Sequence, residues 1–264
     1  MDLQQRHPLS DAMRARVLEE LERIERERNV KVLYACESGS RAWGFASPDS
    51  DYDVRFVYVE KPDWFVQVDT PRDVIERPLD DELDVSGWEL RKALGLLRKS
   101  NPALLEWLNS PLVYRQEDDA TARMRELAER FYSPPAARHH YLSMARKNFR
   151  GYLQDETVRF KKYFYVLRPL LAVRWIDQGR GRPPMTFAEL LQTVDDHALL
   201  LAEVDELLAL KRSADESAYG PRRPALHGFI EAQLEQQAAT LPRTHADSAR
   251  LDQYLRAMVR RYAA

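Results

Sequence analysis

Cysteine is nearly absent from this chain, and its single thiol, Cys36, excludes an intrachain disulfide framework and a multi-cysteine zinc site. No stretch of about 18 uninterrupted apolar residues occurs, so the sequence predicts no membrane-spanning helix. The first ten residues, MDLQQRHPLS, lack the apolar core of a secretory signal. Together these absences predict a soluble protein of a reducing compartment, and we expect it to be cytoplasmic.

An excess of charge of one sign is also missing, because 40 lysine and arginine residues face 42 aspartate and glutamate residues. The net charge therefore excludes no class of partner. The local balance is different between residues 138 and 182, where eleven basic residues accompany three acidic ones. That local excess is compatible with the binding of an anion.

The first part of the chain has a mixed pattern of helix and strand. Residues 10–29 place apolar side chains at helical spacing. Residues 30–37 and 52–59 are rich in β-branched and aromatic residues, which predicts strands. Shorter strands are predicted at 64–69, 73–77 and 82–86. Gly87 is predicted to break the last of these strands before a helix begins.

From about residue 117 onward, strand patterns disappear and helical periodicity dominates. The predicted helices cover 119–131, 135–154, 157–178, 186–211 and 225–262. Strands followed by helices predict an α+β fold. A mixed β-sheet with flanking helices would occupy residues 1–116, and an all-helical domain would occupy residues 117–264.

Three aspartates, Asp49, Asp51 and Asp53, alternate in the stretch PDSDYD, directly ahead of the buried-strand pattern VRFVYV. One interpretation is a calcium site, because residues 49–60 match the spacing of an EF-hand loop, with Val54 in the place of its glycine. A β-branched valine resists the positive φ that this place requires. The following residues read as a strand, so the context argues against a calcium loop.

The extended interpretation places Asp51 and Asp53 on the same face of a strand. Two ionised carboxylates at that range repel each other unless a cation lies between them. Oxygen ligands on a rigid element suit Mg²⁺, with Mn²⁺ as the alternative ion, and water and substrate phosphates complete the coordination. The remaining alternative is a solvated turn, since Asp, Ser and Pro are ordinary turn residues.

The residues between the two long strands favour the metal interpretation. Strand 30–37 runs into ESGSR, residues 37–41, where Gly39 lets the backbone approach a ligand closely. The residues after it can open a short helix with outward-pointing amides, and Ser40 adds a hydroxyl donor. The sequence therefore predicts a phosphate-binding turn shortly before the aspartates.

Gly39-Ser40, followed by Asp-x-Asp at the start of the next strand, resembles the signature of the DNA polymerase beta-like nucleotidyltransferase superfamily. The segments GSRAWGFASPDSDYDVRFVYV and ELDVSGWELRKALGLLRKSNPALLEWLNSPLVY are similar to those of the RNA-repair-pathway polymerase beta family. The resemblance is dense over residues 30–115 and looser through NFRGYL and KKYFYVLRPLL. It implies a nucleotidyltransferase-type mixed sheet in the first domain.

The resemblance also implies a third carboxylate on a later strand, and the matching segment, ELDVSGW, points to Asp84. Strand alternation places Glu82 on the same face, which makes Glu82 the alternative ligand. A second alternative gives Asp84 the structural role of a helix cap. Asp51, Asp53 and Asp84 are therefore the predicted catalytic residues and metal ligands.

Other nucleotide contacts follow from the resemblance near the turn. Gly39 and Ser40 are expected to bind the β- and γ-phosphates. Arg41 is expected to act as a charge clamp, with an ordinary ion pair as the alternative. Arg55 either touches the nucleotide or offsets the aspartates, and Trp43 either covers the site or packs in the core.

Related enzymes use a lysine and a hydroxyl from a helix against the triphosphate. In this chain the resemblance points to Lys161, Lys162 and Tyr163, and Arg168 could share the face of Lys161. A charge run is more often a solvated face than a site, and that alternative stays open. The histidines show no zinc spacing and are expected on the surface, whereas Cys36 is expected to be buried.

The function implied by the resemblance is Mg²⁺-dependent transfer of a nucleoside monophosphate to an acceptor hydroxyl, with release of pyrophosphate. ATP is the expected donor, AMP is the group transferred, and an RNA end is the expected acceptor. Two alternatives stay open: nucleotidylation of a partner protein, and binding of a nucleotide or RNA without catalysis.

Overall fold

The computed structural model describes residues 9–78, 82–213, 218–236 and 247–263. The chain forms two compact units. Among the described residues, the first unit, which we call the sheet unit, comprises residues 9–42, 51–78, 82–132 and 247–263. The second, the helical unit, comprises residues 43–50, 133–213 and 218–236. This division differs from the predicted boundary after residue 116, because two later helices belong to the sheet unit and segment 43–50 belongs to the helical unit.

The sheet unit is built on a five-stranded sheet with the strand order β3-β4-β2-β1-β5. The strands are β1 (Lys31–Glu37), β2 (Tyr52–Val59), β3 (Val74–Pro78), β4 (Leu83–Glu89) and β5 (Val113–Gln116). β2 pairs in parallel with β4, and the other pairs are antiparallel. This mixed sheet, with helices around it and after it, confirms the predicted α+β class.

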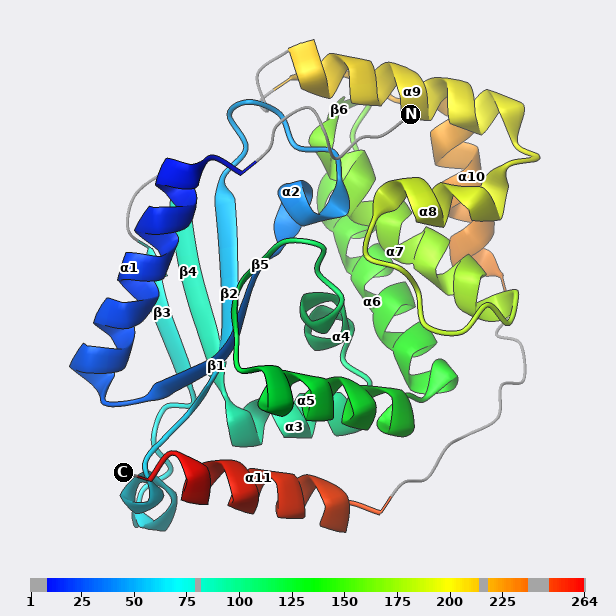
Figure 1. Ribbon diagram of the computed structural model, residues 1–264. Helices are drawn as coiled ribbons and strands as arrows, with labels where there is room; N and C mark the ends of the chain where they lie inside the picture. The colour runs from blue at the N-terminus through cyan, green and yellow to red at the C-terminus, as the bar shows by residue number, and fades with distance from the viewer. Residues whose placement is uncertain (1–8, 79–81, 214–217, 237–246, 264) are drawn as a thin grey trace. The chain divides into compact units, whose positions relative to one another are not determined.

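Helices cover both faces of the sheet, with α1 on one side and α3, α5 and α11 on the other (Figure 1). Their bounds are α1 (Asp11–Arg28), α3 (Leu90–Arg98), α4 (Pro102–Leu108), α5 (Asp118–Phe131) and α11 (Ala249–Arg261). Ser10 begins α1, because its hydroxyl accepts a hydrogen bond from Met13 N at 3.1 Å. Side chains alternate along β2, so Phe56 lies in the core under α1 and Val57 in the core on the other face.

The helical unit consists of α6 (Pro134–Tyr152), β6 (Thr157–Arg159), α7 (Lys161–Asp177), α8 (Phe187–Leu191), α9 (Ala198–Ser213), β7 (Tyr219–Pro221) and α10 (Pro224–Glu235). Segment 43–50 packs in this unit through Phe45, whose ring centroid lies 4.8 Å from that of Phe164 and 5.4 Å from that of Phe187. Among the described parts of the chain, no helix has both the length and the apolar character needed to cross a bilayer.

Two strand predictions in the sheet unit are wrong. Residues 64–69 do not form a strand, because Pro62–Val66 is a 3-10 helix and Val68 is fully exposed. A segment with alternating apolar residues forms a strand only where a neighbouring strand is available for pairing. Residues 64–69 pair with none of the described strands. Gly87 does not end β4 but lies within it. A Cβ at this position would come 2.2 Å from the ring of Phe56, so the close approach of that ring accounts for a glycine inside the strand.

Three predicted helices of the later half are interrupted. Residues 157–178 begin with β6 before α7, and residues 186–211 contain α8, a 3-10 turn and most of α9. The predicted helix 225–262 corresponds to α10 and α11. Residues 237–246 between them lie outside the described residues. Helical periodicity marks the apolar face of each helix and does not mark where one helix stops and the next begins.

Glu89 is a buried carboxyl at the end of β4. It caps α3, because its Oε2 accepts a hydrogen bond from Arg91 N at 2.6 Å. Burial raises the pKa of Glu89 from an ordinary 4.5 to about 7. The folded state therefore retains a proton that the unfolded state releases, so this contribution to stability is complete below about pH 4.5 and is lost as the pH rises through about 7.

Glu89→Gln is expected to flatten this pH dependence, because glutamine stays neutral and can still cap α3. Relative to wild type, the variant should gain on the order of 2–3 kcal/mol in free energy of unfolding between about pH 5 and about pH 8. Urea denaturation at several pH values measures this difference. Glu37, whose pKa is also raised to about 7, contributes the same slope in both proteins. A difference between variant and wild type that does not change with pH would contradict the prediction.

Candidate active site

Two aspartates from different strands become neighbours because β2 and β4 pair in parallel. The register places Asp53 opposite Asp84. Tyr52 and Val54 lie in the core under α1, so Asp53 and Arg55 lie on the opposite face of the sheet. Both aspartates are half-buried. The two strands therefore present a pair of carboxylates on one face.

Arg55 joins these two carboxylates. Its Nη2 lies 2.7 Å from Asp53 Oδ1 and 2.7 Å from Asp84 Oδ2. Its Nη1 donates to the backbone carbonyls of Val54 at 3.0 Å and Asp84 at 3.1 Å. The sequence left two roles open for Arg55, and in the structure its guanidinium offsets the negative charge of the aspartates. It does so through one oxygen of each carboxylate.

The turn after β1 closes against Asp53. Gly39 has a φ of +57°, and a Cβ added there would lie 1.9 Å from Asp53 Oδ2. Ser38 N donates to Asp53 O at 2.8 Å, which ties the turn to β2. α2 (Gly39–Trp43) starts at this turn, and Ser40 is partly exposed there. The second carboxylate oxygen of Asp53 thus faces the backbone of Gly39, where the sequence predicts a phosphate-binding turn.

Arg41 and Asp51 lie beside this turn. The guanidinium carbon of Arg41 lies 3.7 Å from the ring centroid of Tyr52, and its Nε donates to Asp51 O at 3.3 Å. Asp51 itself is exposed and directly precedes β2. The whole length of β2 separates Asp51 from Glu60, so residues 49–60 do not form a calcium loop.

Glu37, the last residue of β1, lies behind the aspartate pair and is completely buried. Its Oε1 accepts from Asp53 N at 2.9 Å, and its Oε2 accepts from the Tyr114 hydroxyl at 2.5 Å. Burial raises the pKa of Glu37 to about 7, although the hydrogen bond from Tyr114 opposes this effect. Sequence reasoning assigned no role to Glu37. The available signal was a carboxyl at the end of the otherwise apolar strand VKVLYACE, directly before the Gly-Ser turn.

The alternatives considered for the third carboxylate can now be compared. Glu82 is exposed ahead of β4, and its carboxylate lies 3.6 Å from the guanidinium of Arg16 in α1. Asp84 lies on a strand and does not cap a helix, because Glu89 caps α3. Asp84 is therefore the residue of β4 that faces Asp53 and Arg55.

Tyr163 was predicted as a nucleotide contact, but the structure places it in the core of the helical unit. Its side chain is fully buried, and its hydroxyl lies 2.7 Å from His227 Nδ1 and accepts from Arg223 N at 2.9 Å. Tyr163 lies among the buried residues of α7, which is the position that helical spacing gives to a core residue. His227 is also buried, so the prediction that all histidines lie on the surface is wrong.

Lys161 and Lys162 begin α7 and are partly exposed. The Nζ of Lys162 lies 3.9 Å from the ring centroid of Tyr152, which is a cation–π contact. The contact of these lysines with a triphosphate stays a prediction from the sequence.

Much of the basic segment 138–182 serves the helical unit itself. Arg138 pairs with Asp177 at 2.7 and 3.0 Å, and Arg168 is buried with its Nη2 donating to Met185 O at 2.9 Å. The guanidinium of Arg168 also lies 4.7 Å from the ring centroid of Trp43. Trp43 packs against Tyr165 as well, at 5.9 Å between ring centroids, which is the core-packing alternative for this residue.

The donor chemistry of the aspartate pair fits a hard cation such as Mg²⁺. A positive charge, the Arg55 guanidinium, already bridges one oxygen of each carboxylate. The missing side chain of Gly39 leaves its backbone against the other oxygen of Asp53. Within the ranges that the structure describes, no three His, Cys, Asp or Glu side chains converge as a ready-made metal centre. What the structure contains is the carboxylate pair of Asp53 and Asp84, with Asp51 two residues before Asp53 in the sequence.

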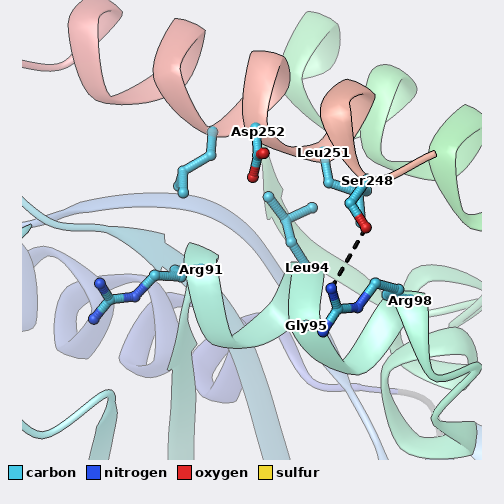
Figure 2. A pocket seen from close by; sticks show the side chains of 8 residues that line it. Arg91, Leu94, Gly95, Arg98, Ser248, Leu251 and Asp252 are labelled. Carbon is cyan, nitrogen blue, oxygen red and sulfur yellow. Dashed lines mark hydrogen bonds between the residues drawn. The ribbon is translucent and has the colours of Figure 1, made fainter.

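A separate groove of the sheet unit lies between α3 and α11, with Leu94, Gly95 and Leu251 among the residues that line it (Figure 2). Arg98 Nη1 donates to Ser248 Oγ at 3.4 Å across this groove. None of the predicted catalytic aspartates, Asp51, Asp53 and Asp84, lines this groove. A Cβ added at Gly95 would meet no atom within 4 Å, so Gly95 is a reference position for the crowded Gly39.

The family comparison agrees with the resemblance seen in the sequence. A model of the RNA repair pathway DNA polymerase beta family matches residues 13–257. The uncharacterized protein YcgL of Bacillus subtilis (strain 168) is 49% identical over 223 residues, which cover 84% of this chain and 86% of that protein. A solved nucleotidyltransferase-like protein from Exiguobacterium sibiricum 255-15 is 12% identical, with 93% of this chain and 78% of that chain covered at a TM-score of 0.31.

Proposed function

Because the chain belongs to the RNA repair pathway DNA polymerase beta family, we propose that it transfers a nucleoside monophosphate from a nucleoside triphosphate to an acceptor hydroxyl. The observation that carries this proposal is the pairing of Asp53 with Asp84 beside the Gly39 turn. A carboxylate pair next to a close backbone approach is suited to a metal-bound triphosphate.

Asp51, Asp53 and Asp84 are the residues that would hold Mg²⁺, with Mn²⁺ as the alternative ion. When bound, the ion neutralises charge on the triphosphate and lowers the pKa of the attacking hydroxyl. Arg55 keeps one oxygen of Asp53 and one of Asp84 directed toward itself, which orients both carboxylates. Orientation of this kind is the main contribution of the protein in phosphoryl-group chemistry.

The nucleotide would lie against the turn after β1. Gly39 and Ser40 bind the β- and γ-phosphates, and Arg41 adds positive charge beside them. The acceptor oxygen forms a bond to the α-phosphorus, and the bond from that phosphorus to the oxygen bridging it to the β-phosphate breaks. Pyrophosphate leaves with that oxygen. Asp84 orients the acceptor hydroxyl and accepts its proton.

We propose ATP as the donor and an RNA end as the acceptor. The RNA acceptor follows from the description of the matching family, which names an RNA repair pathway. A hydroxyl at an RNA end has the chemistry that the reaction requires, since its oxygen can form the new bond to the α-phosphorus.

The proposal is tested by incubating the protein with Mg²⁺ and each α-labelled nucleoside triphosphate, with RNA oligonucleotides that carry free hydroxyl ends. Label is expected on RNA in the wild type, with ATP as the best donor, and on no acceptor with Asp51→Ala or Asp53→Ala. Label on a protein acceptor would replace the RNA proposal with protein nucleotidylation. Tight binding of the Mg²⁺-nucleotide without any transfer would overturn the enzymatic proposal.

A further inference from the structure

We propose that Glu37 is a positioning residue whose buried carboxyl group holds the backbone of Asp53, and with it the carboxylate that faces Gly39 and Arg55. This inference rests on the proposed function for its effect on catalysis. It goes beyond that function by assigning a role to a residue that would touch neither nucleotide nor metal.

The first support is the place where regular pairing between β1 and β2 stops. The last pair in the register is Glu37 with Val54. Continued pairing would have Ser38 and Asp53 exchange two backbone hydrogen bonds. One of the two is present, since Ser38 N donates to Asp53 O at 2.8 Å.

The second backbone bond of that pair is replaced by the side chain of Glu37. The carbonyl of Ser38 accepts from Ala42 N at 3.4 Å, in the first turn of α2, and so serves the helix and not the ladder. Asp53 N donates instead to Glu37 Oε1 at 2.9 Å. The carboxyl group therefore substitutes for a backbone acceptor at the one point where the chain leaves the sheet to form the Gly39 turn.

The third support is the anchoring of Glu37 itself. Its Oε2 accepts from the Tyr114 hydroxyl of β5 at 2.5 Å, and its backbone carbonyl accepts from Ser110 Oγ at 2.7 Å. Of the two carboxyl oxygens, Oε1 therefore accepts from β2 and Oε2 accepts from β5. A group locked at both ends can fix the position of Asp53 to within the tolerance that catalysis needs.

The cost of burying Glu37 favours a positional role over a purely structural one. The side chain is completely buried, and burial raises its pKa even though the nearby charge of Arg41 acts to lower that pKa. An apolar residue at the end of a buried strand would avoid the penalty of removing a carboxyl group from water. The carboxyl group supplies what an apolar residue lacks, which is an acceptor for Asp53 N.

Glu89 provides a matched control from the same sheet. It is as completely buried as Glu37, and its pKa is likewise raised to about 7 by burial. Its side chain caps α3 and contacts none of the proposed catalytic residues. Loss of Glu89 should therefore reproduce the loss of a buried carboxyl group without the effect on Asp53.

The test compares Glu37→Ala, Glu37→Gln and Glu89→Ala with the wild type. Three quantities are measured in the full chain: kcat and KM for transfer, Mn²⁺ affinity in the presence of ATP, and hydrogen exchange of the Asp53 amide. Glu37→Ala is expected to lower kcat and Mn²⁺ affinity about 10- to 100-fold and to speed exchange of the Asp53 amide. Glu37→Gln should stay within about 3-fold of wild type, because its amide oxygen can accept from Asp53 N and its NH₂ can donate to Tyr114.

Glu89→Ala is expected to lower the melting temperature while kcat, Mn²⁺ affinity and Asp53 exchange stay within about 3-fold of wild type. Equal losses in Glu37→Ala and Glu89→Ala would overturn the proposal, and so would unchanged Asp53 exchange in Glu37→Ala. Should Glu37→Ala fail to fold, Tyr114→Phe removes the donor to Oε2 alone. Unchanged Asp53 exchange and kcat in that variant would equally overturn it.

Failure of the proposed function is distinguishable from failure of this inference. If the wild type transfers no nucleotide, the exchange of the Asp53 amide still reports whether Glu37 holds the backbone. If the Asp53 amide exchanges faster in Glu37→Ala while neither the wild type nor any variant is active, the enzymatic proposal is refuted and the positioning role of Glu37 is supported.

Discussion

Asp53→Asn is expected to lower the rate of nucleotidyl transfer about 1,000-fold or more, because it removes the negative charge that would hold the metal ion. Asparagine has nearly the same shape, and its oxygen can still accept from Arg55, which lies 2.7 Å from Asp53 Oδ1. The fold should therefore persist, with a change of about 1 kcal/mol or less in free energy of unfolding. Transfer of an α-labelled nucleotide and urea denaturation measure the two effects.

Asp49→Asn is the control for this experiment. Asp49 is an exposed residue of the turn before β2 and belongs to the same acidic stretch. The substitution removes the same charge as Asp53→Asn, but from a residue that is not a proposed metal ligand. Activity within about 3-fold of wild type is therefore expected. Equal losses in the two variants would mean that the stretch acts through its total charge, and retained activity in Asp53→Asn would exclude Asp53 as a metal ligand.

Gly39→Ala is expected to produce the second largest loss, because the added Cβ would lie 1.9 Å from Asp53 Oδ2 and 2.8 Å from Asp53 Cγ. Either the aspartate or the turn must move, and a displacement of about 1 Å can cost about 100-fold in rate. The φ of +57° at Gly39 adds backbone strain for any L-residue with a side chain. We expect a fall of about 100-fold in transfer and of about 1–2 kcal/mol in free energy of unfolding.

Gly95→Ala makes the same chemical change where space is open. Gly95 lies within α3 at the groove shown in Figure 2, and its added Cβ would meet no atom within 4 Å. Alanine in a helix interior should raise the free energy of unfolding by about 0.5–1 kcal/mol and leave transfer unchanged. If Gly39→Ala behaved like Gly95→Ala, the contact between the turn and Asp53 would have no part in function.

Local sequence patterns anticipated much of the sheet unit. The β-branched run after Asp51 is β2, and strand alternation puts Asp53 and Arg55 on one face of it. The strand predicted at 64–69 failed because a strand also needs a partner, which a local pattern does not reveal. The burial of Tyr163 among the helices of its own unit depends on packing, which a local pattern likewise does not reveal.

The position of the last helix shows the same limit. α11 follows the segments of the helical unit in sequence, yet it belongs to the sheet unit. Leu251 and Met258 lie in the core beside α3 and α5, and the Tyr254 hydroxyl donates to Ala120 O at 2.8 Å. An amphipathic pattern specifies that α11 must cover an apolar surface, but it carries no information about which surface.

By itself the sequence determined the fold class, the strand that begins directly after Asp51 and carries Asp53, and the membership of the chain in its family, because these depend on short-range spacing and on motifs. Only the tertiary structure decided that Asp84 faces Asp53, that Arg55 bridges the two, and that Glu37 replaces a backbone acceptor behind them. Those relations arise from the register between strands far apart in the chain and from the point where β1 leaves the sheet. Neither is a property of any local stretch of residues.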